Sequence, residues 1–198
     1  MFAKLGILRH RDNGTTPPPT GGELQIGTGG SILYQHPINY NDDYGKNAYI
    51  FTAAEVGAAK TITGISFYLR SWSQTPFSYP NQVIKMGHVV QSEFDLDPDM
   101  NFADLSVSGF ITVKPSFTQS IVNNNQWYQI TFNTPFVYDG VNNLLIVWEN
   151  NWGDWSSQVG GTNGVTATNR VAKKDSATFP VTGNGTRSSN RPIIKLHY

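Results

Sequence analysis

Apolar and polar residues alternate over much of this chain, and the pattern predicts β-strands. Residues Tyr128–Phe132 alternate with a period of two, as in a strand that buries one face. Leu144–Trp148 is apolar without interruption, which is typical of a central strand covered on both faces. Between them, Asp139 and Gly140 tolerate positive φ at a tight reversal. The stretch from residue 127 to residue 151 therefore indicates a β-sandwich.

The same pattern places further strands along the chain. These are Tyr49–Thr52, Thr61–Arg70, Gln82–Val90, Leu105–Val113, weak strands near Val165–Val171, and Pro192–Tyr198. One face of the Gln82–Val90 strand is predicted to carry Ile84, Met86, His88 and Val90. Gly64 marks a bulge or a close approach, and Ala53–Ala59 a connection of at most one helical turn. Because no segment has a 3.6-residue period, we expect an all-β fold, an antiparallel β-sandwich of jelly-roll type with about eight or nine strands.

The first residues differ from the rest and predict an extended N-terminal arm. Residues 1–11 combine the apolar side chains of Phe2, Leu5, Ile7 and Leu8 with basic ones, and we interpret them as a docking peptide. Residues 12–23 form a Pro/Gly linker, and residues 24–198 the β-sandwich domain. The alternative is a frayed terminus. Lys4 interrupts the apolar run, so we expect no signal peptide and a chain that stays in the cytoplasm where it is made.

Composition excludes several classes of partner. Only 14% of the residues are charged, and 14 basic residues balance 14 acidic ones. A nucleic-acid-binding protein needs a basic surface, so we expect no nucleic-acid partner and no electrostatic attachment to a membrane. The longest apolar run is far shorter than the roughly 20 residues of a membrane-spanning helix. There are no cysteines, and a domain of this size can bury a sufficient core without disulfides.

The residues that usually carry catalysis form no recognisable motif. His10, His36, His88 and His197 lack the spacing of a zinc site, and His88 is predicted to be a packed strand residue. No nucleophile elbow is present, and the glycines of residues 27–30 lack the Lys and helix of a phosphate loop. We therefore predict no catalytic residues, no cofactor and no enzyme activity.

Acidic side chains provide two weak candidates for a calcium site. Asp95, Asp97 and Asp99 alternate in one loop close to Asp104, but the spacing lacks the glycine and terminal glutamate of an EF-hand. Asp42 and Asp43, next to asparagines, are the second candidate. In both places a solvated loop is the favoured interpretation, so no metal is predicted.

Aromatic residues in loops are the better candidates for binding. Trp152 and Trp155 flank Asp154 in a loop rich in Gly, Ser and Asn, while Trp72 and Tyr79 lie in another long loop. Flat rings beside amides and carboxylates can stack on a sugar and bind its hydroxyls, which makes these five residues candidate ligand-binding residues. The alternative is that the rings close the open end of the sandwich. Trp127 and Trp148 lie on predicted strands and are expected in the core.

Four segments together resemble a known β-sandwich module. They are TITGISFYL (Thr61–Leu69), IKMGHV (Ile84–Val89), ITFNTPFVYDGVNNLLIVWENN (Ile130–Asn151) and RPIIKL (Arg191–Leu196). In this order they resemble the jelly-roll, adhesin-like module of Bacteroidetes surface proteins and their phages. The resemblance covers residues 24–198 and implies an adhesive or structural unit without a shared catalytic set.

Together with the arm, the resemblance implies a structural virion component of a bacteriophage: a head fibre, capsid decoration, spike or tail-fibre protein. Its expected location is the virion, assembled in the host cytoplasm. Its expected partners are other virion proteins, bound through the arm, and further copies in a homo-oligomer on the particle. The alternative is a carbohydrate-binding or adhesin module for host-surface or mucosal glycans. A polysaccharide hydrolase is a third hypothesis, for which no carboxylate pair is recognisable.

Overall fold

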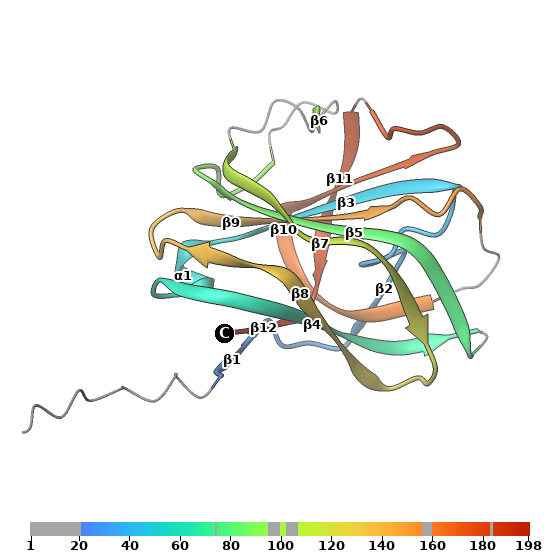
Figure 1. Cartoon of the computed structure of the whole chain (residues 1–198), viewed down its shortest axis with the longest axis horizontal. Coiled ribbons are helices and arrows are strands. Elements are labelled where there is room, and N and C mark those ends of the chain that lie inside the picture. The colour runs from blue at the N-terminus through green and yellow to red at the C-terminus, as the bar shows by residue number, and fades with distance from the viewer. Residues whose placement is uncertain (1–20, 74, 95–99, 102–106, 156–159, 183) are drawn as a thin grey trace, which may run out of the picture.

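A computed structural model gives the fold, and it describes residues 21–198 except 74, 95–99, 102–106, 156–159 and 183. It consists of strands and one short helix (Figure 1). Along the chain they are β1 Glu23–Ile26, β2 Ser31–Tyr34, β3 Tyr44–Phe51, α1 Ala53–Val56, β4 Lys60–Trp72, β5 Phe77–Val89, β6 Met100–Asn101, β7 Val107–Ile121, β8 Gln126–Tyr138, β9 Asn143–Asn150, β10 Gly160–Ser176, β11 Asn184–Pro192 and β12 Ile194–His197. All pairings between them are antiparallel, which confirms the predicted all-β class.

The strands form two layers that share β10. In the first layer β7, β5, β9 and β3 lie side by side, followed by the second half of β10. In the second layer β8 pairs with β4, and β4 pairs on its other side with β12 and with the start of β10. The pairing of β10 with β11 shifts register between Thr166 and Val171, between the two halves of β10. One long strand thus connects the layers.

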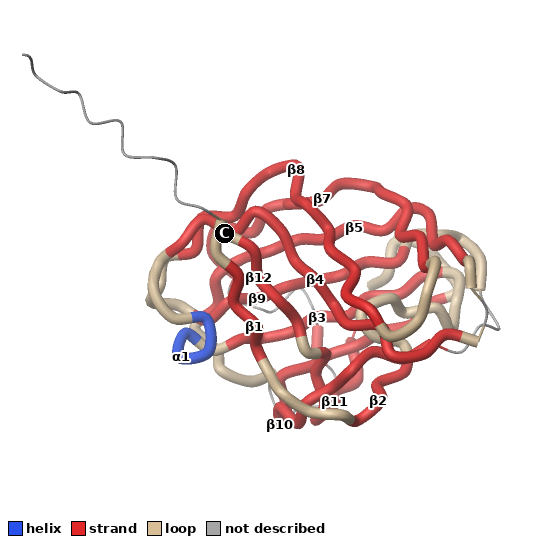
Figure 2. Tube along the Cα trace, turned by 90° about the horizontal axis from the view of Figure 1, so that it is seen from below, coloured by secondary structure: helices blue, strands red, loops and turns tan. Residues whose placement is uncertain are grey.

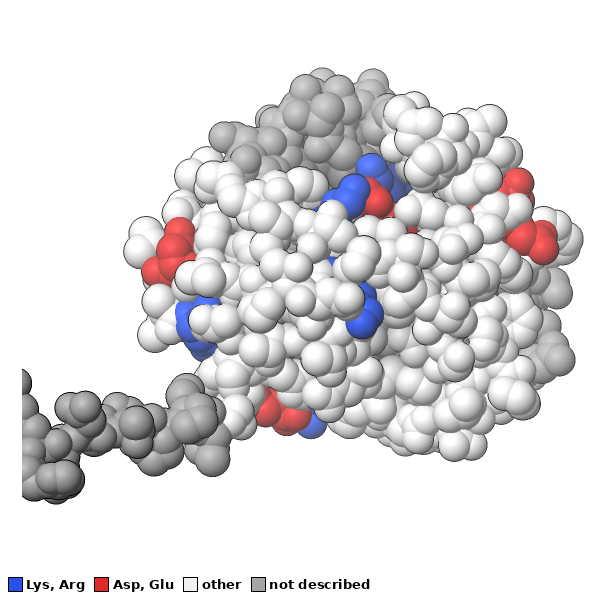
Figure 3. Space-filling view, viewed as in Figure 1, with Lys and Arg blue, Asp and Glu red and all other residues white. Residues whose placement is uncertain are grey.

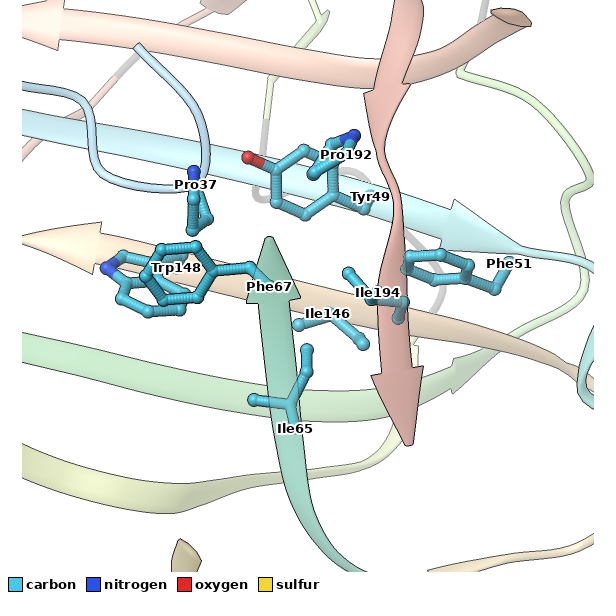
Figure 4. Close-up of a pocket in the computed structure, with 9 residues that line it drawn as sticks. All are labelled: Pro37, Tyr49, Phe51, Ile65, Phe67, Ile146, Trp148, Pro192 and Ile194. Atoms are coloured by element: carbon cyan, nitrogen blue, oxygen red, sulfur yellow. The ribbon is translucent and has the colours of Figure 1, made fainter. Parts of the chain in front are cut away.

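The main hydrophobic core fills the space between the layers. Phe67 of β4 and Trp148 of β9 meet edge to face, with ring centroids 5.6 Å apart. Beside this pair, Ile65, Ile146 and Ile194 help to line an apolar cavity with room for about one water molecule (Figure 4). The cavity is too small for an organic ligand, so the centre of the sandwich is a packed core rather than a binding pocket.

A second apolar cluster covers the outer face of the first layer. Ile50 of β3, Val147 of β9 and Ala172 of β10 belong to it, and Phe94 packs against them from the segment after β5. Every side chain of Leu144–Trp148 is consequently buried. The prediction of a central strand covered on both faces is confirmed.

Two local predictions are also confirmed. The chain makes a single helical turn at α1, within the range predicted for the connection. At Gly64 the pairing of β4 with β8 shifts register, and an added Cβ would lie 2.7 Å from the Ile130 carbonyl oxygen. A side chain is excluded there because the neighbouring backbone approaches so closely.

The predicted number of strands was too low, since the described residues form twelve. The largest difference is β10, which was expected only as weak strands near Val165–Val171. Its first half is rich in glycine because neighbouring side chains fill the space: an added Cβ would lie 1.7 Å from a Trp72 ring carbon at Gly160, and 2.2 Å from Leu33 Cγ at Gly164. Glycines leave no apolar alternation, so the pattern that signals a strand is missing.

Three single-residue predictions were wrong. Trp127 is only half-buried, because it shares the outward phase of β8 with Gln129, and its ring lies 4.6 Å from Lys195 Nζ. Val90 is exposed because β5 ends one residue earlier. Glu23, assigned to the linker, is the first residue of β1 and pairs with His197.

Candidate functional site

Five aromatic side chains form a continuous cluster at one end of the sandwich. This aromatic cluster consists of Tyr40, Trp72, Phe77, Tyr79 and Trp152. Ring centroids are 5.3 Å apart for Tyr40–Trp72, 5.5 Å for Trp72–Tyr79, 5.6 Å for Tyr79–Trp152 and 5.8 Å for Phe77–Trp152, and all four pairs meet edge to face. Such pairs stabilise a fold by about 0.5–1.5 kcal/mol each beyond the area they bury. The cluster therefore holds this end of the molecule rigid.

Strand ends bring the cluster together. Trp72 is the last residue of β4 and lies beside the start of β10 through its pairing with Gly160. Phe77 is the first residue of β5 and pairs with Ile121 of β7. The Tyr40 hydroxyl donates to the Gly160 carbonyl oxygen at 2.8 Å and accepts from its N–H at 3.1 Å. Burial raises the pKa of Tyr40, so the ring carries a neutral hydroxyl.

A buried amide network fixes the loop that follows β9. Gln82 accepts a hydrogen bond from Trp148 Nε1 at 2.9 Å and donates to Asn150 Oδ1 at 2.5 Å. Asn150 in turn donates to the Asn39 carbonyl oxygen at 2.6 Å and accepts from the Trp152 N–H at 3.3 Å. These amides are buried and bonded to one another, so they are not available to bind a ligand. Their role is to fix the segment around Asn39 and the loop that follows β9.

The surface of this end carries one freely exposed indole. Trp155 is 61% exposed, whereas Trp152 is half-buried against the cluster. Asp154 lies between them in the sequence and is exposed. Its carboxylate accepts a hydrogen bond from the backbone N–H of Trp155 at 2.8 Å. Gly153 adopts φ +81° and donates to the Asp43 carbonyl oxygen at 2.9 Å, which anchors the turn.

The structure separates the five candidate binding residues into two groups. Trp72 and Tyr79 were predicted to lie in a long loop, which is wrong: Trp72 belongs to β4 and Tyr79 to β5. Both are buried, at 5% and 0% exposure, so their faces are not available for stacking on a ligand. They close the end of the sandwich, as the alternative interpretation expected. Of the five candidate binding residues, only Trp152, Asp154 and Trp155 therefore remain as candidates for a surface site.

Other candidates contribute nothing to this site. Asp95, Asp97 and Asp99, like the predicted docking residues Phe2, Leu5, Ile7 and Leu8, lie outside the described residues. Within the described residues, no three His, Asp or Glu side chains gather closely enough to hold a metal ion. His88 packs against Phe136 and Tyr138, with ring centroids 4.8 Å and 5.8 Å away, as a packed strand residue.

The chain enters the sandwich at the end opposite to the aromatic cluster. Gly22 and Tyr198 exchange backbone hydrogen bonds, and His197 pairs with Gly64 of β4. From Gly64, β4 runs to Trp72, roughly 25 Å away at about 3.3 Å per residue. Figures 1 and 2 show the C-terminus near α1 and β1 at this entry end.

The entry end contains an ionic cluster that sequence reasoning missed. Glu55 of α1 contacts Arg191 Nη2 at 2.8 Å and Arg170 Nη1 at 3.3 Å. It also accepts from the Thr52 N–H at 2.8 Å. Arg191 is buried, donates to the Ile50 carbonyl oxygen at 2.7 Å and lies 4.0 Å from the Phe51 ring centroid.

The charges of this cluster are set by their partners. Burial alone would raise the pKa of Glu55, but hydrogen bonds from Arg191 and the Thr52 backbone outweigh it and lower the pKa to about 2. The Thr-x-x-Glu spacing of residues 52–55 is a capping-box signal visible in the sequence. The arginines come from β10 and β11, so no local pattern points to them.

No known protein family matches the chain, and no curated protein is significantly similar to it. The resemblance to the Bacteroidetes and phage module therefore stays a prediction. None of the helices among the described residues has the length and apolarity needed to cross a bilayer.

Proposed function

We propose that the chain is a structural component of a bacteriophage virion, such as a head fibre, a capsid decoration, a spike or a tail fibre. The N-terminal arm docks on the particle, and the sandwich projects the aromatic end outward. The observation that supports this is that the entry point of the chain and the exposed indole lie at opposite ends of the domain. The chain enters at Gly22, and Trp72 and the exposed Trp155 lie towards the other end of β4.

The physical argument is one of attachment and rigidity. Burying the four large apolar side chains of the arm contributes on the order of 5–10 kcal/mol before ordering costs. Such a contact is strong when symmetry repeats it on a particle. Two packed layers and a rigid aromatic cluster then hold Trp155 at a fixed distance from the docking surface. Charged side chains are sparse on the face shown in Figure 3, as expected when neighbouring copies pack side by side.

Deletion of residues 1–11 tests the docking role. The shortened chain should keep its melting temperature but no longer assemble with structural proteins encoded by the same genome, measured by co-sedimentation with particles. Replacing Phe2, Leu5, Ile7 and Leu8 by serine should have the same effect, while replacing Arg9 and Arg11 by serine is the matched control. Assembly of the deletion variant at the wild-type level would disprove docking through the arm.

A second function, glycan binding, is favoured by the exposure of Trp155 beside Asp154. An exposed indole next to a carboxylate provides a stacking face and a hydroxyl acceptor on one surface. On a glycan array, Trp155→Ala should abolish binding. Trp127→Ala is the control, because it removes the half-buried indole of β8, and it should leave binding unchanged. An array without any signal for the wild-type chain would exclude this function.

A further inference from the structure

The outer face of the second layer carries polar side chains over four neighbouring strands. β1, β12, β4 and β8 pair in this order and lie side by side in Figure 2. Ile65 and Phe67 of β4 are buried in the core, so Ser66 between them points to the outer face. Gln129, which pairs with Ser66 from β8, is exposed on the same face. Side chains of this face thus lie at the surface of the domain rather than between its layers.

Strand register brings Glu23, Ser66 and His197 together on this face. His197 of β12 pairs with Glu23 of β1 on one side and with Gly64 of β4 on the other. Because Gly64 has no side chain, the His197 ring has room to reach Ser66, the next outward residue of β4. Its Nε2 lies 2.7 Å from the Ser66 hydroxyl oxygen, and its Nδ1 lies 3.9 Å from Glu23 Oε2. The imidazole therefore lies between a hydroxyl and a carboxylate, and each faces a different ring nitrogen.

This order of hydroxyl, imidazole and carboxylate is the one that activates a serine as a nucleophile. When the ring proton is on Nδ1, facing Glu23, the Ser66 hydroxyl donates to Nε2. The distance to Glu23 exceeds that of a hydrogen bond, but such contacts are often long in free enzymes and tighten when a substrate binds. No sequence motif marks the set, because its members come from β4 and from strands at the two ends of the described chain.

Lys195 adds a positive charge beside these three residues. It pairs with Ser66 across β12 and β4, so the two side chains are neighbours on the outer face. Its Nζ lies 2.8 Å from Glu23 Oε1 and 4.6 Å from the centroid of the Trp127 ring. An ammonium group here stabilises the oxyanion that forms when Ser66 attacks a carbonyl carbon. Because Ser66 is only 2% exposed, the flexible Lys195 side chain has to swing towards solvent as a substrate enters, and a small acyl group is favoured.

We propose that Ser66, His197 and Glu23 form a hydrolytic site for esters of small carboxylic acids. Ser66 is the nucleophile, and His197 is the general base and then the general acid. Lys195 stabilises the oxyanion, and Glu23 is a positioning residue that holds the His197 ring. The proposal depends neither on docking through the arm nor on glycan binding, because β1, β4 and β12 provide the whole site.

The reaction proceeds in two balanced stages. His197 Nε2 takes the hydroxyl proton of Ser66 while Oγ bonds to the ester carbonyl carbon, and the carbonyl π electrons move to the oxygen beside Lys195. When the carbonyl forms again, the bond to the alcohol oxygen breaks, and the alcohol leaves with the proton from His197. Water then attacks the acyl group on Ser66 in the same way, and the proton returns to the serine. One ester and one water thus give one acid and one alcohol.

Hydrolysis of p-nitrophenyl acetate by the full chain tests the activity. Ser66→Ala should lower kcat/KM at least about 100-fold, because the nucleophile is lost. Ser78→Ala is the matched control and should keep the wild-type rate, since Ser78 is a strand serine whose hydroxyl bonds to that of Ser120. His10→Gln should also keep it, which excludes hydrolysis by a histidine of residues 1–11. A wild-type rate no higher than that of Ser66→Ala would overturn the proposal.

Covalent labelling separates catalysis from a structural role of the same hydrogen bond. A fluorophosphonate, which reacts with activated serines, should label Ser66 in the wild type, as located by peptide mass spectrometry. The labelling rate should fall at least about 100-fold in His197→Gln. If Ser66→Ala lowers the melting temperature, Ser66→Cys is the second variant, because it keeps the size and a nucleophile and should form an acetyl thioester. A label only on other serines, or equal labelling rates in wild type and His197→Gln, would overturn the proposal.

Glu23→Gln tests the positioning role. It should lower kcat at least about tenfold and leave KM unchanged, because Glu23 contacts His197 and not the substrate. Glu23→Asp keeps the carboxylate and should restore part of the loss. An unchanged kcat in Glu23→Gln would show that the ring is oriented without this carboxylate, and it would remove Glu23 from the site.

Discussion

His36 is a single residue whose burial makes the whole fold sensitive to acid. Its side chain is buried, and its Nδ1 lies 2.9 Å from the Tyr49 hydroxyl. Burial, helped by the positive charge of Lys173, lowers the pKa of His36 from 6.5 to about 3. The folded protein therefore keeps this imidazole neutral, while the unfolded chain binds a proton below about pH 6.5.

The predicted consequence is a loss of stability as the pH falls from 6.5 towards 3. By pH 5, His36 should lower the free energy of unfolding by about 2 kcal/mol relative to pH 8. Urea denaturation of His36→Gln should show a correspondingly smaller change between pH 8 and pH 5. His197→Gln, which leaves His36 in place, should keep the wild-type slope. If His36→Gln keeps that slope as well, another group is responsible for it.

At the scale of elements, α1 depends on contacts that its own sequence does not supply. An isolated four-residue helix is unstable in water. Glu55 caps it through the Thr52 N–H, and Arg191 of β11 holds the Glu55 carboxylate. The connection from β3 to β4 is thus fixed by a strand far away in the sequence.

Removal of Arg191 should therefore be more damaging than removal of Arg170. Arg191→Met leaves Glu55 without its buried partner and should lower the free energy of unfolding by roughly 3 kcal/mol. Arg170→Met removes a half-exposed pair and should cost at most about 1 kcal/mol. Double-mutant cycles with Glu55→Gln measure both coupling energies by chemical denaturation. A coupling no larger for Arg191 than for Arg170 would contradict this account.

Features set by local sequence could be predicted, whereas features set by contacts with distant residues could not. The strands β4, β5, β8 and β9 were predictable because their side chains alternate or form an apolar run, and so was the turn at α1. β10 was not, because its glycines are dictated by Trp72 and Leu33 of other elements. In the candidate site, the exposed Trp155 and the buried Trp72 look alike in the sequence, and only the packing of strand ends distinguishes them.

At the scale of the whole molecule, the sandwich separates an entry end from an aromatic end. In the packed core between them, the apolar cavity shown in Figure 4 has room for about one water molecule. Sites this far apart, without shared contacts, affect stability and binding independently. Docking through the arm and binding at Trp155 are therefore expected to be separable functions.

Because the two ends are separate, a change at one end should leave the function of the other intact. Deletion of residues 1–11 should abolish assembly and leave the affinity for a monovalent soluble glycan unchanged. Trp155→Ala should abolish glycan binding and leave assembly unchanged. Titration calorimetry with a monovalent ligand is the appropriate measurement, because it removes the avidity that an array of copies adds. The double variant should combine both losses without further change in melting temperature. If the deletion weakens monovalent binding by more than about threefold, the two ends are coupled through the core and the domain is not a passive spacer.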